Sequence, residues 1–121
     1  MYNIAKNGII QMHRGDCLCV PLFINIGTEY NPIRFYIKRN PGCKVYLGVM
    51  EPGVAFEEAN IRKMYDSADA EVNEYGDIVV RLTPTDTEFL STGRYYYQVK
   101  VESKNGCVTT VIPLTQFFIL E

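Results

Sequence analysis

The sequence predicts an all-β protein, an antiparallel β-sandwich of about seven to nine strands with one short helical turn near residues 84–90. Apolar and polar residues alternate with period two along most of the chain, which places successive side chains on opposite faces of a strand. Nine Tyr, six Phe, nine Gly and six Pro favour strands and turns over helices. The 121 residues match the size of one compact domain, so a single sandwich domain over residues 1–121 is expected.

The N-terminal part of the chain contains four predicted strands, at residues 9–12, 17–26, 33–38 and 45–49. Turn signals separate them: Arg14-Gly15-Asp16, a loop at 27–32 and Asn40-Pro41-Gly42. The alternation assigns one face of each strand to the core. The predicted core residues are Leu18, Val20, Leu22, Ile24, Ile26, Ile33, Phe35, Ile37, Val45, Leu47 and Val49.

After the break at Glu51-Pro52-Gly53, residues 54–76 show no sustained period, and we expect a loop with one or two short strands. Thr83-Pro84-Thr85-Asp86 supplies a hydroxyl N-cap, a proline at the first helical position and an acid three residues after the cap. A helical turn to about Leu90 is therefore predicted. Asn105-Gly106 predicts a two-residue hairpin turn, because both positions tolerate positive φ. The remaining predicted strands are at residues 78–82, 95–102, 107–112 and 116–120.

Gly93 and Tyr95 follow the predicted helical turn and begin the next strand. Gly93 is expected to adopt positive φ, and Tyr95 is expected to face the core with its hydroxyl bonded to main chain near the crossover. A Tyr in this place is typical of the tyrosine corner of immunoglobulin-like sandwiches. The chain has no Trp and no inter-sheet pair of cysteines at antibody spacing, so the predicted fold is immunoglobulin-like.

Charge and hydropathy exclude two classes of partner. Twelve basic and fourteen acidic residues give a formal net charge of −2, without a basic block, which disfavours nucleic-acid binding. No apolar run approaches the roughly 18 residues needed to span a bilayer, and the first residues lack the layout of a signal peptide. We therefore expect no membrane contact and no export. The four cysteines, Cys17, Cys19, Cys43 and Cys107, fit neither a disulfide framework nor a metal motif, so free thiols are expected.

The sequence gives little support for a catalytic function. The single histidine, His13, ends a strand and is interpreted as a surface residue. The acidic pairs Glu57-Glu58 and Asp66 to Asp69 lie in the irregular segment and are interpreted as a solvated loop. Arg14-Gly15-Asp16 has the form of an integrin ligand, but Gly and Asp are ordinary turn residues. We therefore expect a non-enzymatic protein with no catalytic residue, no metal site and no cofactor.

Five large side chains fall on the faces opposite the predicted core. They are Phe23, Tyr36, Tyr96, Phe118 and Leu120. Large apolar groups on an outer face either mark a partner surface or lie beneath the 51–76 loop, and the sequence leaves both interpretations open.

Several segments, in this order, resemble one known group of proteins. They are Arg14-Gly15-Asp16, Phe35-x-Ile37-Lys38, Ile78 to Thr87, Leu90-x-x-Gly93-x-Tyr95-x-Tyr97 and Phe117-x-Ile119. Together they are similar to the small immunoglobulin-like β-sandwich proteins of phages and prophages of Gram-positive bacteria, which resemble the N-terminal domain of siphophage upper baseplate proteins. The resemblance covers most of the chain, and its motifs are turn and strand signatures. Cys17, Cys19 and a longer insertion around residues 51–70 depart from the family pattern.

The resemblance implies a structural or assembly protein of the virion, part of a tail or baseplate. It implies contacts with other virion proteins or between copies of the chain, and a location in the virion and, during assembly, in the bacterial cytoplasm. The alternative is a carbohydrate- or protein-binding sandwich of a bacterial surface or host-recognition assembly, with tyrosines as stacking platforms.

Overall fold

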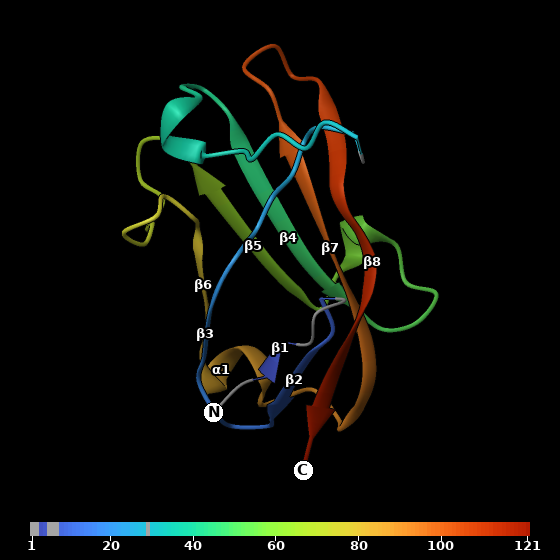
Figure 1. The fold of residues 1–121 in the computed structure, drawn as a ribbon. Coiled ribbons are helices and arrows are strands. Elements are labelled where there is room, and N and C mark those ends of the chain that lie inside the picture. Colours follow the sequence, from blue (N-terminus) through green and yellow to red (C-terminus); the bar gives the residue numbers. More distant parts are fainter. Residues whose placement is uncertain (1–2, 5–7, 29) are drawn as a thin grey trace.

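The computed structural model describes residues 3–4, 8–28 and 30–121 of the chain. It confirms the predicted all-β sandwich, in which a large sheet packs against a small one (Figure 1). The large sheet has the strand order β1-β2-β8-β7-β4-β5, and the small sheet pairs β3 with β6. Within the described ranges, no helix has the length and apolar content to cross a bilayer.

The elements have the following bounds. The large sheet contains β1 (Asn3–Ile4), β2 (Ile10–His13), β4 (Lys44–Met50), β5 (Ile61–Asp66), β7 (Gly93–Glu102) and β8 (Val108–Leu120). The small sheet contains β3 (Leu18–Pro21) and β6 (Val79–Leu82). The helical turns are η1 (Ile37–Arg39), η2 (Phe56–Glu58) and α1 (Pro84–Thr87).

One strand pair departs from the antiparallel pattern. β2 runs parallel to β8, with Ile10 opposite Phe117, whereas the other neighbouring strands are antiparallel. Parallel neighbours need a long connection, and here most of the chain lies between the two strands. β2 and β8 thereby join the N-terminal and C-terminal parts of the chain within one sheet.

The core fills the space between the sheets and follows the predicted alternation in most strands. Leu18, Val20, Leu22 and Ile24 are all buried, as are alternate residues of β4 and β7; in β8, burial is confined to Phe117 and Ile119 near the end of the strand. Ile26 is exposed, so its assignment to the core was wrong. The regular strand ends at Pro21, and the Asn25 side chain then accepts the amides of Gly27 and Ile33, which turns the chain before Ile26 can face inward.

The predicted strand at residues 33–38 was also wrong. Arg34 forms only an isolated bridge with Asn25, and the chain then enters η1. Phe35 and Ile37 are buried as expected, but Ile33 is exposed. The period-two pattern correctly predicted the burial of Phe35 and Ile37. It did not predict the backbone conformation, which follows the local hydrogen bonds of the turns and not those of a strand.

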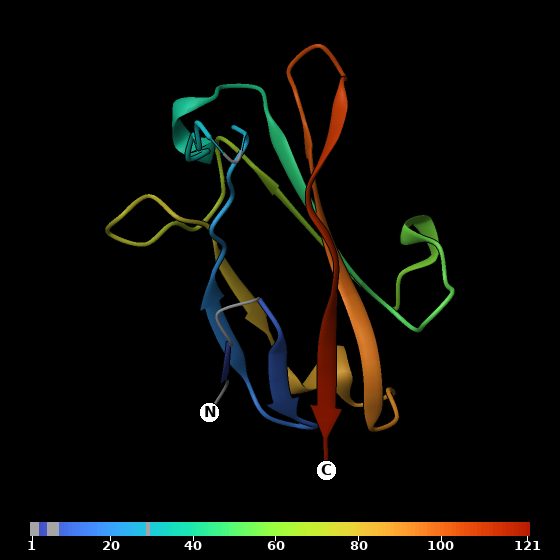
Figure 2. The ribbon, with the colours of Figure 1, turned by 45° about the vertical axis from the view of Figure 1, so that its right-hand side comes forward.

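The segment at 51–76 contains one regular strand, β5, in agreement with the expected one or two short strands. Preceding β5, the η2 loop projects to the side of the large sheet that faces away from the small sheet (Figure 2). Beyond β6, the two last predicted strands are one continuous strand, β8. Pro113 lies in β8 where the register against β7 shifts, which lets the strand continue past a residue without an amide hydrogen.

The hairpin between β7 and β8 differs from the predicted two-residue turn. Ser103 and Cys107 form the last main-chain pair, Gly106 has a φ of 87°, and Asn105 does not have positive φ. The loop therefore has three residues and ends on a left-handed glycine, another common hairpin connection.

The cap of α1 and the glycine at the following corner match the prediction. The Asp86 carboxylate accepts the Thr83 amide at 2.8 Å and the Thr83 hydroxyl at 3.2 Å, so it holds the start of the helix. α1 is shorter than predicted, with a final turn closed by the Leu90 amide on the Thr87 carbonyl. Gly93 then opens β7 with positive φ, as predicted.

Candidate functional site: aromatic and arginine side chains on opposite faces

The five predicted surface residues separate into two groups on different faces. Phe23 and Tyr36 lie together beside the small sheet, joined by Arg34. Tyr96, Phe118 and Leu120 project from the outer face of the large sheet, where Phe118 and Tyr96 are half-buried and Leu120 is exposed. The two groups therefore cannot form one continuous contact surface.

The group beside the small sheet, which we call the Arg34 cluster, consists of Phe23, Arg34, Tyr36 and Arg39. The Arg34 guanidinium lies 5.0 Å from the centre of the Phe23 ring and 5.6 Å from that of Tyr36. The Arg39 guanidinium lies 4.7 Å from the Tyr36 ring centre. Each distance is within the range of an attractive cation–π contact, so the four side chains form an alternating stack of charge and ring.

A buried carboxylate holds this stack in place. Asp77 is almost fully buried and forms an ion pair with Arg34. The Asn73 side chain accepts the amide of Asp77, which fixes the loop that carries the carboxylate. Gly76 has a φ of 88°, and a Cβ there would lie 3.1 Å from the Tyr36 ring, so the glycine lets the loop pack against that ring. The exposed aromatic stack is thus positioned from beneath.

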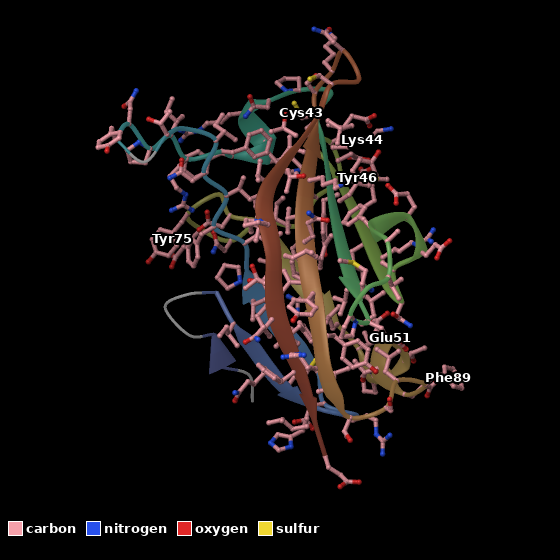
Figure 3. The ribbon with its side chains drawn as sticks, turned by 90° about the vertical axis from the view of Figure 1, so that its right-hand side faces the viewer. Cys43, Lys44, Tyr46, Glu51, Tyr75 and Phe89 are labelled. Carbon is pink, nitrogen blue, oxygen red and sulfur yellow. The ribbon has the colours of Figure 1, made fainter. Side chains whose placement is uncertain are left out.

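Tyr75 extends the aromatic surface on the same side of the molecule. Tyr75 is 73% exposed, and its side chain lies on the side opposite Tyr46 and Phe89 (Figure 3). Tyr and Arg are enriched at protein–protein contacts, and exposed large apolar groups in one region are typical of such surfaces. The sequence located Phe23 and Tyr36, but nothing in it joined them to Arg34 and Asp77.

The second group lies near the end of the outer face formed by β7 and β8. Arg94 stands opposite Phe118, and its guanidinium lies 5.7 Å from the Tyr96 ring centre. Tyr96 stands opposite Gln116 of β8 and, on its other side, opposite Met50 of β4. The inward neighbours Tyr95 and Phe117 are buried, which fits the predicted register of both strands.

A groove that the sequence did not indicate lies on the outer face between β4, β5 and η2. Its volume is about 430 Å³, and its lining includes Tyr46, Gly48, Phe56, Arg62 and Met64. Gly48 forms part of its floor: a Cβ at this position would lie 2.9 Å from the Phe56 ring. The absence of a side chain at Gly48 therefore allows η2 to fold back over the sheet.

Charges border this groove and are partly paired. The Tyr46 hydroxyl donates to the Glu102 carboxylate at 2.9 Å, and this hydrogen bond, with burial, raises the pKa of Tyr46. The Lys100 ammonium lies 4.6 Å from the centre of the Phe56 ring. Such a mixture of ring faces and charged groups suits the binding of polar or amphipathic groups.

The residues considered for catalysis are dispersed. His13 Nδ1 lies 2.8 Å from the Glu121 main-chain oxygen, at the end of the chain, while Glu57 and Glu58 are exposed in η2. Asp66 accepts the amides of Ala68 and Asp69 and so holds a turn. The part of the chain that the structure describes brings no three potential metal-binding side chains together.

The four cysteines are unpaired, with Cys17, Cys19 and Cys107 exposed and Cys43 half-buried. Arg14-Gly15-Asp16 forms the turn between β2 and β3. In this turn Gly15 has a φ of 90°, and the Asp16 amide donates to the His13 carbonyl.

No family model, curated protein or solved structure matches the chain.

Proposed function

We propose that the protein is a non-enzymatic structural or assembly component of a phage or prophage tail or baseplate, acting through protein–protein contacts. The Arg34 cluster is the observation that supports a contact function. It presents Phe23, Tyr36 and two guanidinium groups to solvent in a fixed arrangement, with Asp77 beneath Arg34. Binding costs less entropy when contact side chains are already positioned, and Tyr and Arg dominate the energetically important residues of interfaces.

The partner that this surface favours is another protein of the same particle. The Arg34 and Arg39 guanidinium groups favour carboxylates on the partner, and the rings favour apolar side chains beside those carboxylates. Phage particles are built from repeated contacts between folded domains, a role that a small sandwich with an arranged aromatic face can fill.

Virion incorporation tests the proposal. Particles are induced in the host that encodes the chain, purified on a density gradient and probed for the protein by quantitative mass spectrometry. We expect a fixed number of copies per particle. A protein missing from purified particles would contradict the virion function.

Two variants identify the contact surface. Tyr75→Ala and Arg39→Ala change exposed side chains on the side of the Arg34 cluster, and both are expected to reduce incorporation. Phe89→Ala is the matched control, because Phe89 is 89% exposed and lies on the opposite side (Figure 3). If Phe89→Ala reduces incorporation and the other two variants do not, the Arg34 cluster is not the contact surface.

The groove beside η2 favours a second candidate, binding of a carbohydrate. Phe56 and Tyr46 supply ring surface, and Arg62 and Glu57 supply polar groups around it. A glycan array that compares the native protein with Tyr46→Ala tests this function. Binding that is lost in Tyr46→Ala supports it, and the absence of any glycan bound by the native protein contradicts it.

A further inference from the structure

The first part of β8 presents an open strand edge. β7 pairs with β8 on one side, and β2 occupies the other side only along residues 117–120. Residues 107–110 are all exposed, and in Figure 3 this part of β8 lies in front of the other ribbons. An open edge of this kind can pair with another strand.

The hairpin determines which main-chain groups point toward this edge. The Ser103 amide donates to the Cys107 carbonyl, so these two residues form a hydrogen-bonded pair. Bonded and non-bonded pairs alternate in an antiparallel ladder. The next residue of β8 that is bonded to β7 is therefore Thr109, whereas the amides and carbonyls of Val108 and Thr110 point away from β7. Among the described residues, these outward groups have no main-chain partner.

No charged side chain protects this edge. Proteins commonly prevent pairing at an exposed edge with charged residues, but residues 105–120 contain none. Residues 108–112 are β-branched throughout, which favours an extended strand. The β5 edge of the same sheet differs, because β5 contains charged residues and the Ala70 amide already bonds the Asp66 carbonyl. Of these two edges, the β8 edge is therefore the one that a further strand can join.

Two copies of the β8 edge match each other when they pair antiparallel about Thr109. Val108 of each copy then stands opposite Thr110 of the other, so the outward amides and carbonyls face one another and can all form hydrogen bonds. Centring the pair on Val108 or on Thr110 leaves only that residue bonded to its counterpart. Shifting the strands by an odd number of residues directs the outward groups at residues that are already bonded to β7. The register about Thr109 therefore satisfies the most main-chain groups.

We propose that the chain forms a two-fold symmetric dimer through antiparallel pairing of residues 107–111 with the same residues of a second copy, centred on Thr109. The inference does not depend on the proposed virion function. The large sheets of the two copies become one continuous sheet. The seam is short, because the turn at Gly106 ends it on one side and Pro113 lacks an amide hydrogen on the other. We therefore expect a weak dimer.

The rest of the described fold leaves room for this pairing. The β7–β8 hairpin lies at the end of the sandwich opposite α1 and the C-terminus (Figure 1). A two-fold axis near that end directs the two sandwich bodies away from each other along the strands. The seam also ends before the N-terminal segment reaches β8. Gly106 of the second copy stands opposite Ile112, whereas Gly8 approaches Thr115 and β2 joins the edge at Phe117.

Paired charges test the contact. Sedimentation velocity of the native chain from about 10 µM to about 1 mM is expected to show a mass that rises from 13.8 kDa toward twice that value. Val108→Lys combined with Thr110→Glu places opposite charges across the seam and is expected to retain association. Val108→Lys combined with Thr110→Lys places like charges there and is expected to weaken association about tenfold or more. Thermal melting checks that both variants fold, and equal association of the two folded variants overturns the proposal.

A disulfide between two copies tests the position of the two-fold axis. Thr109 stands opposite its counterpart in a non-bonded pair, where Cα atoms lie about 4.5 Å apart, within the range of a disulfide. In a Cys107→Ser chain, Thr109→Cys is therefore expected to give a disulfide-linked dimer with oxidised glutathione, measured by non-reducing electrophoresis. The Cys107→Ser chain alone measures cross-linking through the other cysteines.

Thr110→Cys in the same Cys107→Ser chain is the matched control. Position 110 faces Val108 of the second copy and not its own counterpart, so this variant is expected to cross-link much less than Thr109→Cys. Equal cross-linking of the two variants overturns the register. A native chain that stays monomeric up to about 1 mM overturns the dimer itself.

Discussion

The Tyr95 hydroxyl donates a 2.8 Å hydrogen bond to the carbonyl of Ser91, four residues earlier in the chain. Tyr95 is buried in the core, so one side chain links the crossover after α1 to the interior of the sandwich. This is the geometry of a tyrosine corner. It ties the connection between the two sheets to the strand that follows it.

Removing Tyr95 is expected to cost much of the stability of the domain. Tyr95→Ala deletes a buried ring and the bond to Ser91, and we expect the free energy of unfolding to fall by about 3 kcal/mol. Tyr95→Phe keeps the ring and is expected to cost about 1 kcal/mol. Tyr96→Ala is the control on the opposite face and should cost less than Tyr95→Ala. Urea unfolding measures all three, and a larger loss in Tyr96→Ala would contradict the register of β7.

Gly93→Ala isolates the cost of backbone conformation. Gly93 has a φ of 144°, and a Cβ there would meet no atom within 4 Å. The penalty therefore comes from the dihedral angle alone, and we expect a loss of about 1 kcal/mol or more. Thermal melting monitored by circular dichroism measures it. An alanine variant as stable as the native chain would show that the corner adapts without positive φ.

Tyr65→Phe is expected to stabilise the protein. Among the described residues, the buried Tyr65 hydroxyl has no hydrogen-bond partner, and an unsatisfied buried polar group costs about 1–3 kcal/mol. The phenylalanine keeps the ring and removes the hydroxyl, so the free energy of unfolding should rise. Tyr46→Phe is the matched control: it removes a hydroxyl that donates to Glu102, and it should not stabilise the protein.

The same residue predicts a dependence on alkaline pH. Burial, together with the negative charge of Asp86, raises the pKa of Tyr65 to about 12. The unfolded chain, with an ordinary tyrosine pKa near 10, then releases this proton first, so stability declines as the pH rises from about 10 through 12. The decline should be smaller in Tyr65→Phe. Identical pH profiles of the two proteins would exclude this contribution.

The thiols supply a chemical test. Cys17 and Cys19 lie two residues apart at the start of β3, and both are exposed. Residues with this spacing in a strand have Cα atoms about 6–7 Å apart, which is at the limit for a disulfide. Titration with a thiol reagent under denaturing, non-reducing conditions is expected to find four free groups. Two or fewer would show that a disulfide has formed.

The local sequence pattern was enough to predict the class of fold and much of the core. Period-two alternation identified Leu18, Val20, Val45 and Leu47 as inward-facing, because the pleat of a strand determines which side chains share a face. Proline, glycine and capping residues likewise predicted α1 and the corner at Gly93. These signals act over a few residues, so they can be read without knowing which strands are neighbours.

Tertiary contacts decided the rest. The ion pair of Arg34 and Asp77 joins residues 43 positions apart, and the approach of η2 to the sheet depends on Gly48 having no side chain. The sequence alone therefore placed Phe23 and Tyr36 on outer faces, but only the folded chain joined them through Arg34 into one cluster. The physical reason is that a strand pattern determines the direction of a side chain, whereas its neighbours depend on which distant segments the two sheets bring together.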